Sequence, residues 1–191
     1  TTIGGALFLD YARSQGYADV ALAQSEWFLR QRLWQQDGWV VSVQPLVKLP
    51  GVSNDARPLI GSSQADAALS MQGGYGFSYL GQWHYADVSA EYRYRFGAPN
   101  NQYRVIASAG IGIAPEWTLM PQAFFTWRAQ SGGASTYTQS ERDDYNLTTL
   151  QLSTVYAFTP SQSVQLGAFK DVAGSNAGAG EGVLLALWSR F

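Results

Sequence analysis

Residues 86–96 read ADVSAEYRYRF, and apolar and polar side chains alternate through this stretch without a break. The even positions carry Ala, Val, Ala, Tyr, Tyr and Phe, while the odd positions carry Asp, Ser, Glu, Arg and Arg. Successive side chains of a β-strand point to opposite faces, so a period of two predicts a strand with one apolar and one polar face. The stretch therefore predicts a strand that separates two different environments.

The same period continues on both sides of this stretch. Residues 67–79 place Ala, Leu, Met, Gly, Tyr and Phe at odd positions, and small or polar residues at even ones. Comparable alternation begins near Ile3, Ala21, Trp39, Tyr103, Trp117, Asn146, Val164 and Val183. Residues 18–36 are rich in helix formers, but their charges recur with period two and favour a strand. We predict about ten antiparallel strands of roughly 10 to 15 residues, longer than the usual five or six.

The connections between these strands alternate between short and long. Gly, Pro and Asp mark tight turns at residues 35–38, 80–82, 114–116 and 159–161. The other connections include hydrophilic loops at 51–64, 130–144 and 172–181, with briefer ones at 13–17 and 97–101. Short turns on one rim and long loops on the other are typical of outer-membrane barrels.

Composition narrows the class of protein further. The chain has 191 residues, a formal net charge of -2 and no cysteine, so it carries neither a disulfide framework nor a basic face for nucleic acid. Charged residues make up 14% of the chain, against roughly 25% in soluble domains. No apolar run approaches the roughly 20 residues of a membrane helix. We expect one domain over residues 1–191, beginning inside a strand; strands before Thr1 would raise the count to about twelve.

Alternation alone does not say which face points outward, because a soluble lipocalin-like barrel has the same period. The chain has 7 Trp, 11 Tyr and 9 Phe, too many rings for the lumen of a narrow soluble barrel. Placed outside, the rings would form girdles at two membrane interfaces, and the charged rows would line the interior. An open edge in hydrocarbon leaves backbone groups unsatisfied. We therefore predict an all-β fold, a closed antiparallel up-and-down transmembrane barrel.

The polar faces of the predicted strands carry the most informative side chains. The predicted interior charge cluster comprises Glu26, Arg30, Arg32, Asp87, Glu91, Arg93, Arg95, Arg104 and Arg128. One interpretation is a charged constriction that selects solutes, and the other is a salt-bridged plug that only satisfies a narrow interior. A ten-stranded barrel lies between eight-stranded barrels filled by side chains and sixteen-stranded porins. Both interpretations stay open at this point.

No motif for catalysis, cofactor binding or metal binding stands out. His84 is the sole histidine and follows a predicted turn between Trp83 and Tyr85, so an interfacial anchor is the plainer interpretation than a catalytic base. Acidic residues in the loops at 54–55 and 141–144 are a calcium alternative, but solvated loop carboxylates explain them equally well. The glycines of 174–182 lack the Lys-Ser/Thr pair of a phosphate loop. We predict a protein that is not an enzyme and has no cofactor.

The chain ends in LLALWSRF, residues 184–191, with Val183, Leu185 and Leu187 on one parity and Phe191 as the last residue. This ending resembles the C-terminal signature of Gram-negative outer-membrane β-barrel proteins, although Ser189 stands where the signature usually has an apolar or aromatic residue. The resemblance implies that Phe191 is an assembly signal read by the barrel-assembly machinery. It also implies a partner only during biogenesis.

A second resemblance rests on RQRLWQQDGWVVSVQPLVKLPG, residues 30–51, and YAFTPSQSVQLGAFK, residues 156–170. These strand-turn-strand segments look like those of outer-membrane channels associated with phenol meta-pathway degradation, which usually have near twelve strands. The resemblance covers about a third of the chain and implies transport.

Together these patterns predict a monomer in the bacterial outer membrane, surrounded by lipid, forming a narrow channel for passive passage of small solutes, amphipathic or aromatic ones included. The alternative is a non-transporting envelope barrel, a structural or interaction module whose outer loops bind a partner or an exported polysaccharide. A lipid-active enzyme ranks third. No nucleic-acid partner is expected.

Overall fold

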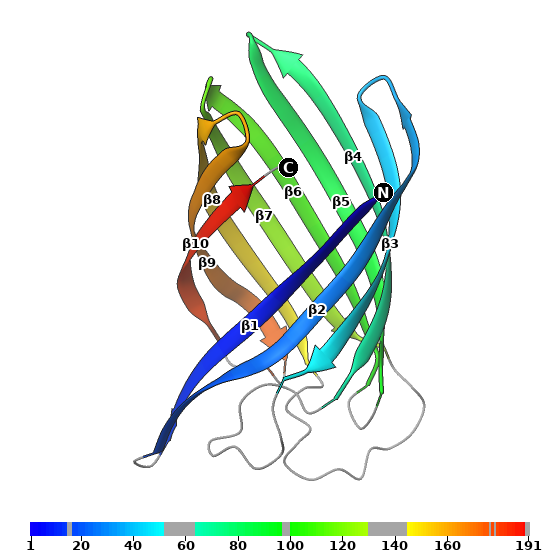
Figure 1. Cartoon of the computed structure of the whole chain (residues 1–191), viewed down its shortest axis with the longest axis vertical. Helices are drawn as coiled ribbons and strands as arrows, with labels where there is room; N and C mark the ends of the chain where they lie inside the picture. The colour runs from blue at the N-terminus through cyan, green and yellow to red at the C-terminus, as the bar shows by residue number, and fades with distance from the viewer. Residues whose placement is uncertain are drawn as a thin grey trace.

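The computed structural model describes residues 1–14, 17–51, 64–96, 100–129, 145–175, 177 and 179–189. They form ten strands: β1 (Thr2–Ser14), β2 (Tyr17–Gln36), β3 (Trp39–Pro50), β4 (Asp66–Tyr79), β5 (Gln82–Arg95), β6 (Gln102–Ala114), β7 (Trp117–Arg128), β8 (Asn146–Thr159), β9 (Gln162–Ser175) and β10 (Glu181–Ser189). Each strand pairs antiparallel with its neighbour in sequence, giving one sheet in the order β1 to β10 (Figure 1). The predicted all-β, up-and-down fold of ten strands is confirmed.

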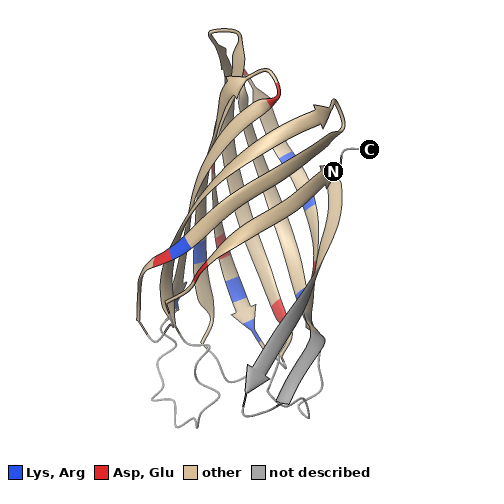
Figure 2. Cartoon of the chain, turned by 90° about the vertical axis from the view of Figure 1, so that its left-hand side faces the viewer, with Lys and Arg blue, Asp and Glu red and all other residues tan. Residues whose placement is uncertain are grey.

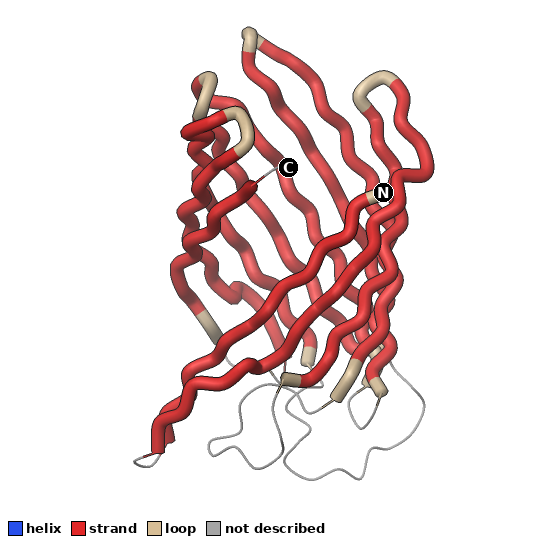
Figure 3. Tube along the Cα trace, viewed as in Figure 1, coloured by secondary structure: helices blue, strands red, loops and turns tan. Residues whose placement is uncertain are grey.

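The sheet curls into a half-barrel, and most of the described residues are in strands (Figure 3). β1 and β10 are its two edges, and no ladder between them occurs within the described residues. The strands and their order therefore agree with the predicted barrel, but the predicted closure is not seen among the described residues.

Two-residue turns join alternate strand pairs at one end of the sheet, called here the turn end. These turns are Asp37–Gly38, Leu80–Gly81, Pro115–Glu116 and Pro160–Ser161. In the first two, both residues have positive φ, 48° and 85° for Asp37 and Gly38, and 50° and 75° for Leu80 and Gly81. Such φ values match the twist of the flanking strands in a tight hairpin. The strand ends that the longer connections join lie at the opposite end, called the loop end.

Several bounds differ from the predicted ones, and the brief loop predicted at 13–17 is wrong at both ends because β1 continues to Ser14 and β2 begins at Tyr17. β2 has 20 residues and carries a register shift between Arg32 and Trp34, so it exceeds the predicted strand length. The loop predicted at 172–181 is wrong over its first four residues and its last one, because β9 continues to Ser175 and β10 begins at Glu181. A register shift between Thr148 and Thr149 absorbs the extra residue on β9 and lets pairing with β8 resume.

The two faces of the sheet reverse the usual distribution of polar and apolar side chains. Among the described residues, three buried side chains are hydrophobic and eleven are polar or charged. Large apolar side chains lie on the convex outer face instead; Ile3, Leu185 and Val183 are 79%, 74% and 83% exposed. Buried charges are costly unless they are paired, so a group of buried charged side chains is unusual. The concave face therefore carries the candidate functional site.

No helix long and apolar enough to cross a membrane occurs in the part of the chain that the structure describes.

Candidate functional site

A row of alternating charges crosses four neighbouring strands near the loop end of the concave face. Strand register places Glu26 of β2 opposite Lys48 of β3, Lys48 opposite Asp66 of β4, and Asp66 opposite Arg95 of β5. Opposite charges that face each other across strands attract, so this register is electrostatically favourable along the whole row. The row brings together segments up to 69 positions apart in the chain.

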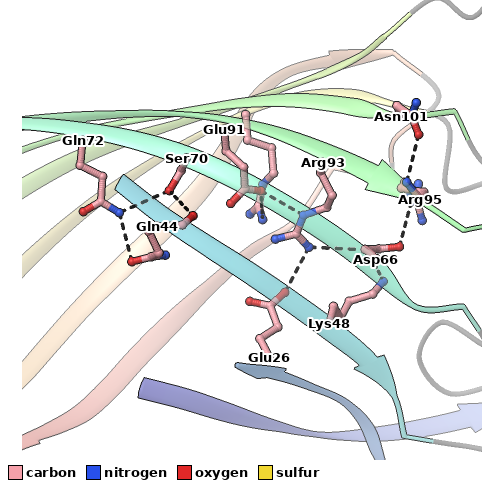
Figure 4. Close-up of polar contacts among 11 residues, drawn as sticks. Glu26, Gln44, Lys48, Asp66, Ser70, Gln72, Glu91, Arg93, Arg95 and Asn101 are labelled. Carbon is pink, nitrogen blue, oxygen red and sulfur yellow. Dashed lines mark hydrogen bonds and ion pairs between the residues drawn. The ribbon is translucent and has the colours of Figure 1, made fainter. Parts of the chain in front are cut away.

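Asp66 is the centre of this arrangement, with a side chain only 1% exposed. Its Oδ2 lies 2.7 Å from Lys48 Nζ and 3.7 Å from Arg93 Nη1, and its Oδ1 lies 3.8 Å from Arg95 Nε (Figure 4). Oδ1 is buried without a hydrogen-bond partner among the described residues. A buried carboxylate needs compensation from neighbouring positive charges, and three cations supply it here.

Arg93 joins the row to a second layer of side chains. Its Nη1 donates to Glu26 Oε1 at 3.1 Å, and its Nε donates to Glu91 Oε1 at 3.0 Å (Figure 4). Arg104 Nη1 lies 3.7 Å from the same oxygen of Glu91. We call the seven residues Glu26, Lys48, Asp66, Glu91, Arg93, Arg95 and Arg104 the ion-pair cluster. It holds four cations and three carboxylates on one side of the half-barrel, from β2 to β6.

Five of the predicted interior residues belong to this cluster: Glu26, Glu91, Arg93, Arg95 and Arg104. The sequence reasoning missed Lys48 and Asp66, although both have the polar parity of their strands, which was the available signal. Arg30, Arg32 and Asp87 lie closer to the turn end and line a separate cavity. Arg128 lies at the loop end of β7, opposite Gln102. Charged positions are concentrated toward the loop end (Figure 2).

Two adjoining cavities occupy the concave face between the ion-pair cluster and the turn end. The larger cavity, of about 580 Å³, is lined by residues from both edges of the sheet. These are Thr1, Thr2 at the start of β1, and Trp188 of β10. The smaller, of about 250 Å³, reaches the cluster at Glu91 and Arg104. Arg30, Gln72 and Asp87 line both cavities. The cavities therefore form a polar path along the inside of β2 to β6.

A row of neutral amides and hydroxyls covers the other side of the concave face. Gln122 donates to Ser108, Gln151 donates to both Gln122 and Ser153, and Gln165 donates to Ser153, at 2.8 to 3.2 Å. The indole N–H of Trp188 donates to Gln165 Oε1 at 3.1 Å and completes the row. We call these residues the amide row. It fixes the Trp188 ring at the larger cavity, a role that the sequence reasoning did not assign.

Glycines on the concave face leave room for large neighbours. Gly110 of β6 lies opposite Tyr85 of β5, and a Cβ atom at Gly110 would overlap the Tyr85 ring. The Tyr85 hydroxyl donates to Met120 Sδ at 3.2 Å across the interior. The absence of a side chain at Gly110 therefore allows Tyr85 to reach over β6.

The outer face carries two bands of aromatic rings. Near the turn end, Trp39, Tyr75 and Phe77 form a series with ring centroids 4.8 and 5.7 Å apart, and His84 stacks on Phe77 at 5.3 Å. Toward the loop end, Tyr92 contacts Tyr103 at 5.2 Å and Phe125 stacks on Trp127 at 5.6 Å. On β5 the outward residues between His84 and Tyr92 are Ala86, Val88 and Ala90. An aliphatic belt therefore separates the two bands.

His84 lies on this outer face, and its Nε2 is 3.3 Å from the carbonyl oxygen of Tyr79. His84 therefore has no place in the interior, and its interfacial anchoring stays a prediction. Among the residues that the structure describes, no three His, Cys, Asp or Glu side chains are arranged to hold a metal ion. The acidic loops at 54–55 and 141–144, most of the long outer loops, Arg190 and Phe191 lie outside the described residues.

No protein-family model matches the chain, and no curated protein sequence is detectably similar to it.

Proposed function

We propose that the protein is an outer-membrane β-barrel whose polar interior is a narrow path for passive movement of small solutes. The observation that carries this proposal is the reversed burial of the sheet, with ionised groups buried on the concave face and aliphatic side chains exposed on the convex one. In water, such a convex face would expose a large apolar surface, a marker of contact with a membrane or another protein. A bilayer gives that surface an apolar environment.

The spacing of the aromatic bands supports a bilayer over a protein partner. His84 and Tyr92 are eight residues apart on β5, which corresponds to about 26 Å along a strand. A strand tilt of about 40° reduces this to about 20 Å across the membrane, near the height of the apolar zone of outer-membrane barrels. Aromatic rings are enriched at both interfaces of such barrels, with aliphatic residues between them.

Membrane insertion requires the edges of the sheet to be satisfied. β1 and β10 run antiparallel to each other, and Thr2 and Trp188 already line the same cavity. We propose that these two strands pair in the bilayer and close the barrel, because unpaired backbone groups in hydrocarbon cost several kcal/mol each. Further strands preceding β1 would close a barrel of about twelve in the same manner.

The interior supports a path for solutes that is polar, narrow and uneven. The two cavities run from the turn end to Arg104, which keeps 34% of its side chain exposed. Beyond Arg104, the buried members of the ion-pair cluster narrow the interior, since Arg93 and Arg95 are only 5% and 7% exposed. Solutes that pass this point would be selected by charge and hydrogen bonding.

A non-transporting envelope barrel is the second candidate function, and the dense packing of the ion-pair cluster favours it. If the cluster fills the interior as a plug, the barrel would serve to present its outer loops to a partner or an exported polysaccharide. The same side chains would then stabilise the barrel without selecting any solute.

Single-channel recording in planar bilayers distinguishes the two functions. A channel predicts discrete conductance steps from the refolded wild-type protein, and Arg104→Gln should shift its ion selectivity toward cations because one positive charge leaves the path. Lys170→Gln is the matched control, because it removes the same charge from the outer face. Complete electrical silence of folded, inserted wild type would refute the channel.

A further inference from the structure

The larger interior cavity combines positive charge with aromatic surface. Arg30 and Arg32 of β2 line one side, Tyr85 and Asp87 of β5 line another, and Trp188 of β10 lies at its margin. Its volume of about 580 Å³ falls within the range of small-molecule sites, roughly 300 to 1,000 Å³. The cavity is large enough for a ligand with a ring and a charged substituent.

The side-chain hydrogen bonds of the two arginines in this cavity go to neutral partners. Arg30 Nε donates to Gln44 Oε1 at 2.9 Å, and its Cζ lies 5.7 Å from the centroid of the Phe28 ring. Arg32 donates to the side-chain oxygen of Gln35. In the described part of the chain, no carboxylate lies within ion-pair distance of Arg30 or Arg32, in contrast to Arg93 with its two glutamates.

The cavity therefore keeps an excess of positive charge. Among the described residues, Asp87 is the only carboxylate that lines it; Asp87 attracts Arg30 electrostatically, but two guanidinium groups share this single negative charge. Within the described part of the chain, the Nε of Arg30 donates to Gln44, and its two Nη groups make no hydrogen bond and can donate to a ligand. A guanidinium group fits a carboxylate with two parallel hydrogen bonds, which an ammonium group does not match.

Two rings are held beside these arginines by their polar atoms. The Trp188 indole is anchored through its N–H to Gln165 and still has 43% of its surface exposed. The Tyr85 hydroxyl is anchored to Met120. Because both polar atoms are already engaged, the ring surfaces are what these residues can offer to a ligand, and planar apolar groups pack well against them.

We propose that this cavity binds a small organic anion, with its carboxylate between Arg30 and Arg32 and its planar apolar body against Trp188. The proposal names the solute class of the proposed channel and depends on that function for its biological use. Binding itself needs only the folded interior, so it is measured without a membrane current.

Isothermal titration calorimetry on the full chain, refolded in detergent micelles, tests the site with benzoate as the probe. Benzoate should bind saturably with one site per chain, and the neutral benzamide should bind at least about tenfold more weakly. Arg30→Gln and Arg32→Gln should each weaken benzoate binding about tenfold, because each removes a charge-assisted hydrogen-bonding partner. Benzoate binding should also change the tryptophan fluorescence of the wild-type protein, because the ligand packs against Trp188. Trp188→Phe should remove this change.

Lys170→Gln is the matched control, since Lys170 pairs with Glu181 on the outer face and its loss changes the net charge equally. It should leave benzoate affinity unchanged. If an arginine variant fails to fold, Gly74→Leu tests the same cavity. A Cβ atom at Gly74 would meet Asp87 Cβ at 3.4 Å and the Ala86 carbonyl oxygen at 3.6 Å, which are ordinary contacts, and the longer side chain would fill the cavity. That variant should abolish benzoate binding.

Three results would overturn the anion site: no saturable benzoate binding to folded wild type, equal affinity for benzamide, or an equal loss in Lys170→Gln. The experiments can refute the anion site and the channel independently of each other. Conductance without benzoate binding would refute the site and leave the channel, while benzoate binding without conductance would refute the channel and leave the site.

Discussion

Asp66→Asn is expected to destabilise the folded protein strongly, because Asp66 is the shared partner of three buried cations. Asparagine has nearly the same shape, so the substitution removes a charge and leaves no cavity. The ion-pair cluster has four cations and three carboxylates, a local charge of +1. Without Asp66 the local charge becomes +2, and Lys48 loses its ion-pair partner at 2.7 Å.

The magnitude follows from the burial of the groups involved. Removal of one partner from a buried ion pair costs about 3 to 5 kcal/mol, since the remaining charge is left uncompensated in a poorly polarisable interior. Glu181→Gln breaks an exposed pair, in which Lys170 and Glu181 are 69% and 73% exposed at a distance of 3.3 Å. Exposed pairs contribute at most about 1 kcal/mol, so this variant is the matched control.

Urea unfolding in lipid vesicles, followed by tryptophan fluorescence, measures both variants. Lys48→Met combined with Asp66→Asn returns the local charge to +1, so the double variant should be more stable than the sum of the two single losses predicts. Equal stability losses for Asp66→Asn and Glu181→Gln would refute the argument. Strict additivity of Lys48→Met and Asp66→Asn would refute it as well.

Three further perturbations test other parts of the structure. Val88→Arg, in the aliphatic belt of β5, should lower folding stability in vesicles by about 2 to 4 kcal/mol, whereas Tyr79→Arg near the turn end should cost at most about 1 kcal/mol; equal effects would contradict the bilayer placement. Gly110→Val should cost about 1 to 3 kcal/mol in urea unfolding because its side chain overlaps Tyr85, while Gly73→Ala, with open space around its Cβ, should not. Gln165→Leu removes the hydrogen-bond acceptor of the Trp188 indole and should make that indole more accessible to acrylamide quenching. The Trp188 signal is the difference in fluorescence between proteins with and without Trp188→Phe. Unchanged quenching would show that Gln165 does not hold the ring.

Local sequence was sufficient for the strands and for several of the hairpins. The alternation in residues 86–96 identified β5 and assigned Asp87, Glu91, Arg93 and Arg95 to the concave face. The Leu80–Gly81 turn sets the register of its hairpin, so Asp66 lies opposite Arg95 by counting outward from the turn. Both the side of the strand and the partner within a tight hairpin follow from short-range geometry.

Pairing across a long connection had no such local determinant. Lys48 lies opposite Asp66 through the ladder between β3 and β4, and these strands are joined by a long connection instead of a two-residue turn from which pairs could be counted. Arg104 likewise meets Glu91 across the connection between β5 and β6. The cluster therefore could not be assembled from the alternation alone, and Lys48 and Asp66 remained two polar residues on separate strands.

The sequence by itself determined the all-β meander, its turn end and loop end, and which side chains occupy each face, because these depend on the two-residue period of a strand and on turn chemistry. Only the tertiary structure decided which charges meet, that Asp66 is their centre, and that Arg30 and Arg32 donate hydrogen bonds to neutral side chains beside a cavity. Those properties depend on the register between strands distant in sequence and on the curl that brings Thr2 and Trp188 to one space. The alternation of residues determines the face to which each side chain points, whereas the curl of the sheet and the strand register determine which side chains lie close together.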